Sequence, residues 1–504
     1  MTAPGLTHFL ARLEAASNRP IFAVDGAPAR SGADLLRASA AVARRLCAAG
    51  PAGSRVVVAA HPSFETLAAI VGAMRAGWIA VPLGLRYGPR ELDPILADCT
   101  PTAVAGPLHP SWDLTRAAHD DRITRVVVDV PVGRIPLSDP PDPTDPSTAC
   151  LIVYTSGTTG RSKGAVHTMR SLFGAMASLA EAWGFSPDDI VTHALPLHHV
   201  HGLCIGVVAA LGAGAAVRLA PRFRAQDVAT AFEAGATVYC GVPTQYRKIL
   251  DHLAQAPASA RSLARGRLFT SGSAALPVAR FEAFEAHTGH RILERYGMTE
   301  TMITLSNPLE GPRVPGTVGR PLPGFETRLE PAGAPGLPDA SELLVRGVGL
   351  FDGYFGAPGT TAAAFDADGF FRTGDLVQQT ADGTFRIVGR CSADIIKSGG
   401  FKIAAREIEE VLRMHPAVAE VAVLGVPDAT FGEAVAAAVV PAGGRASPGL
   451  ADELRAHCRR HLADYKKPRL VWFLDALPRN AMGKVQKHVL RDEAPDLPDQ
   501  RANR

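Results

Sequence analysis

The sequence predicts an α/β fold in several domains, and three observations support this. The chain has 504 residues, more than one ordinary domain holds, so at least two domains are expected. Strand-like and helix-like runs alternate through its first half, and the pattern changes near Gly316 and again at Gly389-Arg390. Together these features predict two α/β units, a small β region and a separate C-terminal domain.

The first α/β unit is expected to begin with a helix from about Ala33 to Gly50, because its apolar residues have helical spacing and it ends at a glycine. The next expected elements are strand 56–60, helix 64–75, strand 80–82, helix 90–97 and strand 102–105. This βαβ series is typical of a largely parallel sheet covered by helices. The proline-rich stretch from Pro131 to Pro146 has little to bury and is expected to be a surface connection.

A second α/β unit follows in the same pattern. Its expected elements are helix 170–183, strand 217–219, a helix from Ala225, strand 237–240, a helix from Thr244 and strand 267–270. From about Gly316, short alternating runs separated by glycine and proline predict a small antiparallel β-barrel or sheet.

The stretch after Gly389-Arg390 predicts a small α+β domain. Its expected elements are helix 405–414, strands 418–424 and 434–441, helix 450–462 and strand 469–474. About 110 residues suffice for such a domain. We therefore expect a large N-terminal domain at 1–390 and a small C-terminal domain at 391–504.

Composition narrows the functional classes. The formal net charge is only +3 at pH 7, so neither nucleic acid nor a membrane surface is an expected partner. The N-terminus has no basic region followed by a long apolar one, and the apolar run 203–216 is short and typical of a buried helix. The seven cysteines are odd in number, scattered and without a CxxC pair, which indicates reduced thiols in a cytoplasmic protein.

The stretch from Tyr154 to Gly164 (YTSGTTGRSKG) predicts a phosphate-binding loop. Its glycines let backbone N–H groups approach a ligand closely, while its hydroxyls and Lys163 add donors and positive charge. It is not a Walker A loop, because Lys163 does not directly follow a glycine and is itself followed by Gly164. By residue type alone, a flexible glycine–serine turn is an equal alternative.

Further polar stretches are not explained by core packing. The histidines of His198–Gly202 (HHVHG) fit a loop–helix junction better than a zinc site, because no Cys, Asp or Glu stands beside them. The stretch Thr270–Ala275 follows a strand, at the end where parallel sheets bind ligands. The remaining stretches are Glu294–Glu300 (ERYGMTE), Phe371–Asp375 with Gly389-Arg390, and the tail loop around Lys484.

Two of these stretches suit a nucleotide. Glu294–Glu300 offers an aromatic face, a hydroxyl and a carboxylate within one loop, and Glu300 suits Mg²⁺, which takes one or two carboxylates plus substrate phosphates. Asp375 and Arg390 provide an acid and a base that could hold a ribose diol.

Taken in order, these stretches resemble the core motifs of the adenylate-forming superfamily, which comprises acyl-CoA synthetases, adenylation domains and luciferase-like enzymes. The matching motifs are Tyr154–Gly164, Glu294–Glu300, Thr373–Asp375, Gly389–Asp394 with Lys397–Gly400, and Lys484. The match runs from about Ala33 to Lys487, and the ordered set is specific where any one motif would be weak. The resemblance implies a large N-terminal domain of two α/β subdomains plus a small β-barrel, and a small mobile α+β C-terminal domain that rotates.

The resemblance also implies a two-step reaction with ATP, Mg²⁺ and CoA. A carboxylate attacks the α-phosphate of ATP and pyrophosphate leaves; a thiol then displaces AMP from the acyl-adenylate. No enzyme nucleophile is needed, in agreement with the lack of a recognisable Ser/His/Asp or Cys/His arrangement. Charge neutralisation on the phosphates is what the protein must supply.

The resemblance assigns roles to individual residues. The catalytic residues are expected to be Lys484, Thr299, Glu300 and His201; Glu300 also holds Mg²⁺, and Lys484 reaches both the carboxylate and the α-phosphate in the first step. The expected ATP-binding residues are Thr155, Ser156, Gly157, Thr158, Thr159, Gly160, Lys163, Ser273, Ala274, Glu294, Tyr296, Gly297, Thr299, Asp375 and Arg390. The expected CoA-facing residues are Lys397, Ser398, Gly399 and Gly400, and the expected hinge is Ser392, where relatives often have Asp or Lys.

Arg295 indicates which acid is the substrate. The stretches 198–202, 272–277 and 294–301 most resemble malonyl-CoA synthetases, and many other relatives have glycine at the position of Arg295. A buried guanidinium needs an anionic partner, which a second substrate carboxylate would supply. An internal ion pair with Glu294 or another acid is the alternative.

The rest of the acyl site is expected around Arg295. The family's second carboxylate-binding arginine follows Val-Pro-Thr-x-Tyr by two positions, where this chain has Lys248, with Arg247 one position earlier. The full expected set is Arg295, Lys248, Arg247, His201, Ser271, Met298 and Met302.

Three functions remain open from the sequence. The first is a ligase that makes malonyl-CoA or methylmalonyl-CoA. The second is an enzyme that loads another small carboxylic acid onto the phosphopantetheine of a carrier protein; amino-acid activators usually have an aspartate early in the pocket, and no acid occurs from His198 to Ala216. The third is a binding relative without catalysis, against which the intact motif residues argue.

Overall fold

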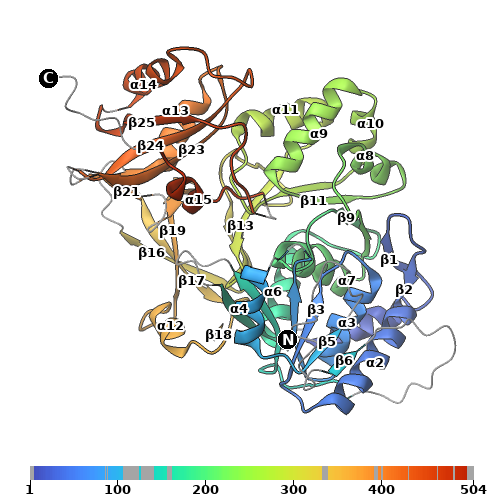
Figure 1. Ribbon diagram of the computed structural model, residues 1–504. Helices are drawn as coiled ribbons and strands as arrows, with labels where there is room; N and C mark the ends of the chain where they lie inside the picture. The colour runs from blue at the N-terminus through green and yellow to red at the C-terminus, as the bar shows by residue number, and fades with distance from the viewer. Residues whose placement is uncertain are drawn as a thin grey trace. The chain divides into compact units, whose positions relative to one another are not determined.

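The computed structural model describes residues 5–85, 87, 89–105, 124–126, 141–155, 162–331, 339–390, 395–398, 401–428, 431–462, 464–480 and 483–495. The chain divides into two compact units, one formed by residues 1–326 and 345–371, the other by residues 327–344 and 372–504 (Figure 1). The expected domain boundary between Arg390 and Cys391 adjoins residues 391–394, which lie outside the described part, and it stays a prediction.

The first unit contains a nine-stranded sheet with the strand order β15-β14-β13-β12-β11-β9-β10-β1-β2. Its strands are β1 (Pro20–Val24), β2 (Arg30–Ser31), β9 (Ile190–His193), β10 (Ala216–Leu219), β11 (Val238–Gly241), β12 (Leu268–Ser271), β13 (Leu293–Met298), β14 (Met302–Ser306) and β15 (Arg320–Pro321). From β13 to β1 the pairs are parallel. The N-terminal strand β1 joins the second α/β unit through the register Phe22↔Val217.

Four helices pack on the strands at the centre of this sheet: α8 (Ala225–Glu233), α9 (Pro243–Gln255), α10 (Ser259–Leu263) and α11 (Val278–Thr288) (Figure 1). Their apolar faces form one buried cluster with Tyr239 and Phe269 of the sheet. Phe232 stacks on Phe269, with ring centroids 5.0 Å apart. This core supports the carboxyl ends of β11 and β12, where the polar site begins.

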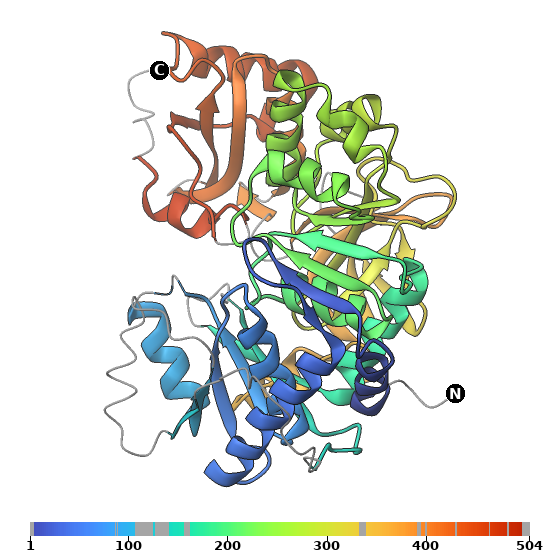
Figure 2. The same ribbon diagram turned by 90° about the vertical axis from the view of Figure 1, so that its right-hand side faces the viewer.

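The first unit also contains a seven-stranded sheet with the order β18-β8-β7-β4-β3-β5-β6 (Figure 2). Its strands are β3 (Arg55–Ala59), β4 (Ile79–Leu83), β5 (Ala103–Ala105), β6 (Thr124–Val126), β7 (Ala149–Thr155), β8 (Lys163–Thr168) and β18 (Gly353–Tyr354). The remaining helices of this unit are α1 (Leu6–Ala15), α2 (Gly32–Ala49), α3 (Phe64–Arg75), α4 (Pro89–Cys99), α6 (Met169–Ala182), α7 (Ala210–Gly212) and α12 (Pro358–Ala363). The antiparallel pair β7–β8 places Thr155 opposite Lys163, so these two residues frame the predicted phosphate loop.

The expected buried helix over 203–216 has an unusual form. Residues His201–Ala209 form a π-helix (η1), followed by the short α7. π-Helical segments are rare and often occur at functional sites. A Cβ at Gly206 would lie 2.4 Å from Nε2 of His193, so the glycine lets η1 approach the end of β9.

The second unit includes most of a four-stranded sheet with the order β16-β17-β19-β20, in the region predicted as a small barrel or sheet. Its strands are β16 (Phe325–Pro331), β17 (Ser341–Gly347), β19 (Phe371–Gln379) and β20 (Phe385–Arg390). The C-terminal part has a five-stranded sheet of β21 (Ile395–Ser398), β22 (Phe401–Ala404), β23 (Val418–Asp428), β24 (Gly432–Pro441) and β25 (Leu470–Phe473).

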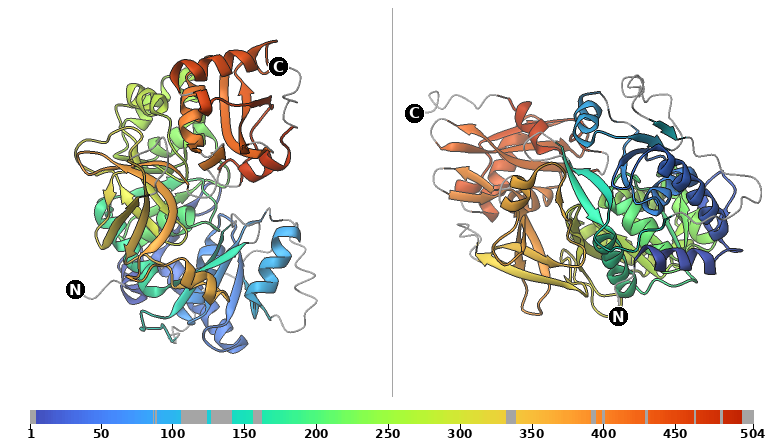
Figure 3. Two further views of the ribbon diagram at one scale, coloured as in Figure 1. Left: turned by 90° about the vertical axis from the view of Figure 1, so that its left-hand side faces the viewer. Right: turned by 90° about the horizontal axis from the view of Figure 1, so that it is seen from below.

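Helices cover both faces of this five-stranded sheet (Figure 3). Side chains of α13 (Ala405–Arg413) and α14 (Leu450–His461) share a cluster with Val421 and Val423, whereas Leu490 of α15 (Lys487–Asp492) shares a cluster with Ala422 and Leu424. This alternation is the period of two expected for a strand buried on both faces. The α+β prediction for this region is confirmed.

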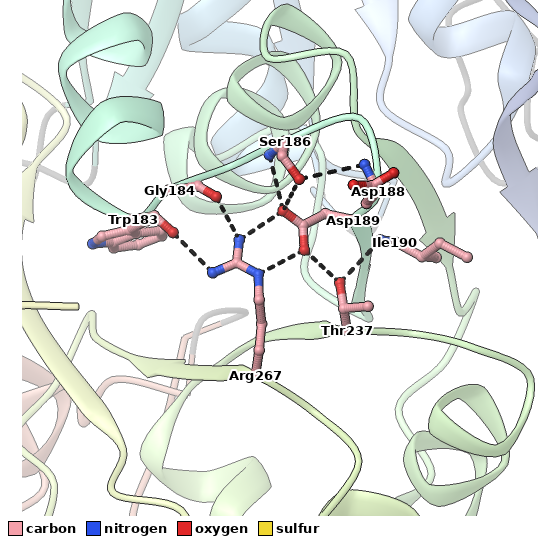
Figure 4. Close-up of polar contacts among 8 residues, drawn as sticks. All are labelled: Trp183, Gly184, Ser186, Asp188, Asp189, Ile190, Thr237 and Arg267. Carbon is pink, nitrogen blue, oxygen red and sulfur yellow. Dashed lines mark hydrogen bonds and ion pairs between the residues drawn. The ribbon is translucent and has the colours of Figure 1, made fainter. Parts of the chain in front are cut away.

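A buried carboxylate ties together the amino ends of three strands of the nine-stranded sheet (Figure 4). Asp189 accepts hydrogen bonds from Arg267 Nε and Nη2 at 2.7 and 2.6 Å and from Thr237 Oγ1 at 2.7 Å. Arg267 also donates to the carbonyls of Trp183 and Gly184. Burial alone would raise the pKa of Asp189, but Arg267 and Thr237 outweigh it, so this pKa is lowered. The network is structural, because it lies at the end of the strands opposite to the polar site.

Among the helices of the described ranges, none combines the length and the apolar character that crossing a bilayer requires.

Candidate active site

The acyl side of the candidate site forms where β11, β12 and β13 end side by side. The register pairs Gly241 with Ser271 and Ser271 with Glu294, which brings the carboxyl end of β12 beside Arg295. In parallel sheets this edge is the usual place for ligands. The end of strand 267–270 thus lies at an edge of the sheet where a ligand can bind, as the sequence predicts; whether a ligand binds there stays a prediction.

Arg295 is a buried cation that has no anionic partner among the residues the structure describes. Its residue is 5% exposed, and within the described part of the chain neither Nε nor Nη2 has a hydrogen-bond partner. Burial lowers the pKa of Arg295 to about 10, so the guanidinium remains protonated at neutral pH. An unpaired buried charge is costly, which makes this position an anion site.

The internal ion pair considered as an alternative is absent from the described residues. The Glu294 carboxylate accepts a hydrogen bond from the Gly316 backbone N–H at 2.9 Å, and no ion pair joins it to Arg295 in that part of the chain. Adjacent strand residues point to opposite faces of a sheet, so Glu294 and Arg295 diverge. The charge of Arg295 is thus available to a ligand.

Small residues of the β12 loop make room for the guanidinium. A Cβ at Gly272 would lie 2.3 Å from Cζ of Arg295, so only glycine allows the guanidinium to lie against this loop. The next residue, Ser273, has φ +68° and its Oγ lies 3.1 Å from Nδ1 of His201. His201 from η1 is therefore oriented by the same loop that accommodates Arg295.

Further buried polar atoms at the ends of β9 and β12 and in η1 lack partners among the described residues: Thr270 Oγ1, Ser271 Oγ, and Nε2 of His201 and of His193. Burial, and then the charge of Arg295, place the pKa of His201 well below its usual value, so its imidazole is neutral. The neutral imidazole of His201 and the guanidinium of Arg295 can together bind an anion by hydrogen bonds. Of the predicted residues, Arg295 lies against Gly272, and His201 contacts Ser273 of the same loop. Ser271 is in register with Glu294 at the end of β12, and Ala274 is exposed.

The stretch Glu294–Met298 is a strand, β13, rather than the loop expected from the sequence. It is antiparallel to β14, with Met298 opposite Met302 and a register shift at Tyr296/Gly297. A Cβ at Gly297 would lie 1.9 Å from the Met302 carbonyl oxygen, so glycine is required at the shift. Met302 is buried with φ +56°, and Tyr296 O–H lies 3.9 Å from Sδ of Met298.

The predicted second carboxylate anchor lies on the outer face of α9. Gln245, Tyr246 and Ile249 are buried, whereas Arg247 and Lys248 are exposed. Within the described residues no hydrogen bond or ion pair joins Lys248 to Arg295. The role of Lys248 and Arg247 in carboxylate binding stays a prediction.

The phosphate side of the site is built from β8, β18 and the turn after β13. Nζ of Lys163 lies 5.1 Å from the ring centroid of Tyr354, within cation–π range. Tyr354 O–H donates to Oε1 of Glu300 at 3.0 Å. Tyr354 therefore lies between the predicted phosphate-binding lysine and the predicted magnesium ligand. Thr155 frames the same hairpin, while Ser156, Gly157, Thr158, Thr159 and Gly160 lie outside the described residues.

Two hydrogen bonds to backbone carbonyl oxygens also hold the Thr299–Glu300 turn. Nε2 of His167 lies 2.8 Å from the carbonyl oxygen of Thr299, and the Phe351 N–H donates to the carbonyl of Glu300 at 2.9 Å. Burial lowers the pKa of His167 to about 4, so the ring is neutral and donates from Nε2. The sequence motifs missed His167 and Tyr354, because their roles depend on contacts with residues more than fifty positions away.

The residues around Glu300 fit a substrate-borne Mg²⁺. The Glu300 carboxylate is 6% exposed and has Tyr354 as an orienting donor. Across the described ranges there is no group of three or more His, Cys, Asp or Glu side chains placed to hold a metal. One carboxylate completed by phosphate oxygens and water is the usual Mg²⁺ arrangement, which suits this donor set.

In the second unit, the expected ribose-binding pair occupies facing positions. Asp375 of β19 lies opposite Arg390 of β20. Within β19, Thr373 Oγ1 accepts a hydrogen bond from the Asp375 N–H at 3.0 Å and donates one to the Leu343 carbonyl at 2.6 Å. Asp375 is 4% exposed, and the preceding Gly374 has φ +67° within β19.

The other predicted residues of the second unit are less fully described. Lys484 is exposed in a hairpin of the tail. Lys397 and Ser398 belong to β21, and Ser398 is buried. Ser392, Gly399 and Gly400 lie outside the described residues, so the hinge and half of the CoA-facing segment stay predictions.

Comparisons with known proteins agree with this arrangement. The AMP-binding enzyme family model matches residues 11–355, and the model of the AMP-binding enzyme C-terminal domain matches residues 407–484. The chain is 36% identical to a malonate–CoA ligase of Arabidopsis thaliana over 486 residues, covering 87% of this chain and 78% of the relative. It is 37% identical to a sulfoacetate–CoA ligase of Cupriavidus necator, covering 90% of each chain.

Solved structures show the same similarity. ATP-bound MatB from Rhodopseudomonas palustris superimposes with a TM-score of 0.87 at 35% identity, covering 97% of this chain and 99% of the other. A malonyl-CoA ligase in a ternary product complex with methylmalonyl-CoA and AMP has a TM-score of 0.68 at 43% identity, covering 92% and 97%.

Proposed function

Because the chain belongs to the AMP-binding enzyme family, we propose that it is an ATP-dependent acid–thiol ligase that joins malonate to CoA and releases AMP and pyrophosphate. The single observation that carries the choice of acid is the buried guanidinium of Arg295, which has unsatisfied donors and no protein anion in the described residues. A substrate with a second carboxylate satisfies this group; a monocarboxylate leaves it unpaired.

In the first step an oxygen of the reacting carboxylate forms a bond to the α-phosphorus of ATP, and the bond from that phosphorus to pyrophosphate breaks. Arg295 holds the distal carboxylate, and the neutral imidazole of His201 offers a hydrogen bond beside it. Lys163 and Lys484 neutralise phosphate charge, and Asp375 with Arg390 holds the ribose. In the second step the CoA sulfur bonds to the acyl carbon, the bond from that carbon to AMP breaks, and the thiol proton is lost to solvent.

We assign Mg²⁺ to Glu300, with Tyr354 orienting the carboxylate. When bound, the ion neutralises charge on the phosphates of ATP. We also assign Ser392 as the hinge and Lys397–Gly400 as the segment that faces CoA in the second step, with domains at 1–390 and 391–504. These assignments follow the family pattern of the motifs.

The deciding experiment is acid-dependent pyrophosphate release from ATP. The acids are malonate, methylmalonate, succinate, acetate, benzoate and a set of amino acids, followed by product mass after CoA is added. We expect malonate to give the highest kcat/KM, methylmalonate to follow, and malonyl-CoA to form. Absence of turnover with every dicarboxylate would reject the acid assignment and leave the family membership unaffected.

Sulfoacetate is the second candidate acid, because it also presents an anion two bonds from the reacting carboxylate. Nε and Nη2 of Arg295 and Nε2 of His201 have no partner among the described residues, so they can bind a three-oxygen sulfonate as well as a carboxylate. Sulfoacetate therefore belongs in the same panel, and a kcat/KM above that of malonate would make it the substrate.

Two further points are proposals of the same kind. CoA is the proposed acceptor, and phosphopantetheine on a carrier protein is the alternative; thioester mass with each acceptor separates them. The cytoplasm is the proposed compartment, which cell fractionation tests.

A further inference from the structure

Lys484 lies in a short hairpin that is closed by its own backbone. The Asn480 N–H donates to the Lys484 carbonyl at 2.9 Å, and the Lys484 N–H donates to Oδ1 of Asn480 at 2.9 Å. Arg479 and Val485 form an antiparallel bridge, and Gln486 N–H bonds to the Pro478 carbonyl. These hydrogen bonds hold the hairpin together internally. Its position relative to the five-stranded sheet depends on the contacts made at its two ends.

The anchoring surface is the edge strand β23 of the five-stranded sheet. In the described residues β23 pairs only with β24, so one row of its backbone groups has no strand partner. The carboxylate of Glu409, on α13, satisfies part of this edge by accepting from the Val423 N–H at 2.9 Å. Glu409 is 8% exposed; burial alone would raise its pKa, but Lys487 and Arg413 outweigh this and lower it, so the group is ionised.

Three side chains attach the hairpin and the helix after it to this same edge. Arg479 Nη2 lies 2.8 Å from Oε2 of Glu420, on β23. Lys487 Nζ, at the start of α15, lies 2.9 Å from Oε1 of Glu409. Arg491 Nε donates to the Gly425 carbonyl at 2.9 Å. Lys487 is only three positions from Lys484 and is the link nearest to it.

We infer that Lys487 is a positioning residue for adenylation: its ion pair with Glu409 holds the Lys484 hairpin on the edge of β23. The inference rests on the proposed role of Lys484 in the first half-reaction. Lys487 itself touches no substrate. Without the ion pair, Leu490 of α15 stays in its apolar cluster. The hairpin, however, loses the contact with Glu409 that lies nearest to Lys484 in sequence, so the Lys484 side chain samples more orientations.

The pair has a natural matched control on the same carboxylate. Arg413 also bonds to Glu409, with Nη2 3.0 Å from Oε2, but it lies on α13, and among the described residues no hydrogen bond or ion pair joins it to the hairpin. Replacing either cation removes one charge from Glu409. Only the replacement of Lys487 releases the Lys484 hairpin.

The test compares Lys487→Met, Lys487→Gln, Lys487→Arg, Arg413→Met and Lys484→Met in both half-reactions. Adenylation is followed as pyrophosphate release with the best acid of the substrate panel, and thioester formation is followed from the supplied acyl-adenylate and CoA. We expect Lys487→Met and Lys487→Gln to slow adenylation about ten- to a hundredfold, as small misplacements of a reacting group do. Thioester formation should stay within about twofold, Lys487→Arg should recover most of the rate, and Arg413→Met should leave both steps within about twofold.

Hydrogen exchange gives a readout that does not depend on turnover. The amides of Asn480, Lys484 and Gln486 are hydrogen-bonded in the hairpin, so we expect faster exchange there in Lys487→Gln and unchanged exchange in Arg413→Met.

Equal losses in both half-reactions, or equal effects of Lys487→Gln and Arg413→Met, would overturn the inference and leave a purely structural ion pair. If Lys484→Met keeps its adenylation rate, the proposed role of Lys484 fails as well. If Lys484→Met loses adenylation while both Lys487 variants keep it, only the inference fails.

Discussion

At the scale of single residues, the unusual feature is a guanidinium without an anion. Arg295 is buried beside Gly272, whose missing side chain allows the close approach. Its desolvation is costly in the free protein and is offset when an anion binds. The proposed role of Arg295 is therefore in substrate specificity rather than in fold stability.

We predict that Arg295→Leu costs about 2–5 kcal/mol of transition-state binding with malonate, because a desolvated charge pair is lost. The kcat/KM with acetate should change little, since acetate has no anion for this group. Arg291→Leu, with a side chain 43% exposed, is the matched control and should leave both substrates unaffected. Equal losses on malonate and acetate would show that Arg295 has a structural role.

Tyr354 supports a second residue-scale prediction. Tyr354→Phe removes the hydrogen bond to Glu300 but keeps the ring beside Lys163, and a hydrogen bond to a charged group contributes about 1.5–3 kcal/mol. We expect the Mg²⁺ concentration for half-maximal pyrophosphate release to rise about tenfold. Tyr354→Leu removes both contacts and should also weaken ATP binding measured by calorimetry. If the Mg²⁺ dependence of Tyr354→Phe were unchanged, Tyr354 would have no role in orienting Glu300 for Mg²⁺.

At the scale of elements, a network of polar contacts connects the amino ends of three strands of the nine-stranded sheet. The Asp189–Arg267–Thr237 network joins the amino ends of β9, β11 and β12, and the proposed acyl site lies at the opposite, carboxyl ends of the strands. Rigid strand ends of this kind allow the loops beyond them to hold a ligand precisely.

Asp189→Asn is expected to lower the free energy of unfolding by about 2–3 kcal/mol at neutral pH, somewhat less than a fully buried pair because Arg267 is partly exposed. The pKa of Asp189 is lowered on folding from its ordinary 3.8, so its contribution is fully present above about pH 4 and disappears as pH falls through the folded pKa. Urea unfolding at several pH values should therefore show the gap between wild type and variant narrowing below pH 4. The exposed neighbour Asp188→Asn should show no such gap.

The π-helix η1 is a second element with a local requirement. Gly206→Ala would place a Cβ 2.4 Å from His193, and overpacking of this kind costs about 1–3 kcal/mol. Gly212→Ala in the adjoining α7 meets only Phe9 at 3.7 Å and should be neutral or slightly stabilising. Thermal unfolding of the two variants compares them directly, and equal midpoints would contradict the close contact.

At the scale of the whole molecule, the candidate residues are divided between two units. The first unit contains the residues of the proposed acyl site, Arg295 and His201, together with Lys163, Tyr354 and Glu300. The second unit contains Asp375, Arg390 and Lys484. A reaction in two steps can use the groups of the second unit unequally.

Lys484→Met is predicted to abolish adenylation while sparing thioester formation, because Lys484 is assigned to the α-phosphate and carboxylate of the first step only. Pyrophosphate release and CoA consumption from supplied acyl-adenylate measure the two steps separately. If Lys484→Met lowered both rates equally, Lys484 would not be specific to the first step.

The secondary structure and the order of the motifs could largely be predicted from the sequence. The α/β class, most helices and strands, and the ordered motifs were predictable because periodicity and glycine or proline signals act within a few residues. The motif Glu294–Met298 was expected to be a loop and is a strand, because its pairing with β14 is set by tertiary contacts.

By itself the sequence determined the class of fold, the order of the motifs and the presence of a cation at Arg295. Only the tertiary structure decided that β1 joins the nine-stranded sheet, that His167 and Tyr354 hold the Thr299–Glu300 turn, and that Arg295 has no protein anion in the described residues. Residue identity and periodicity are local properties of the chain. Burial, register and the partner of a charge depend on segments far apart in sequence, so they are settled only when the chain packs.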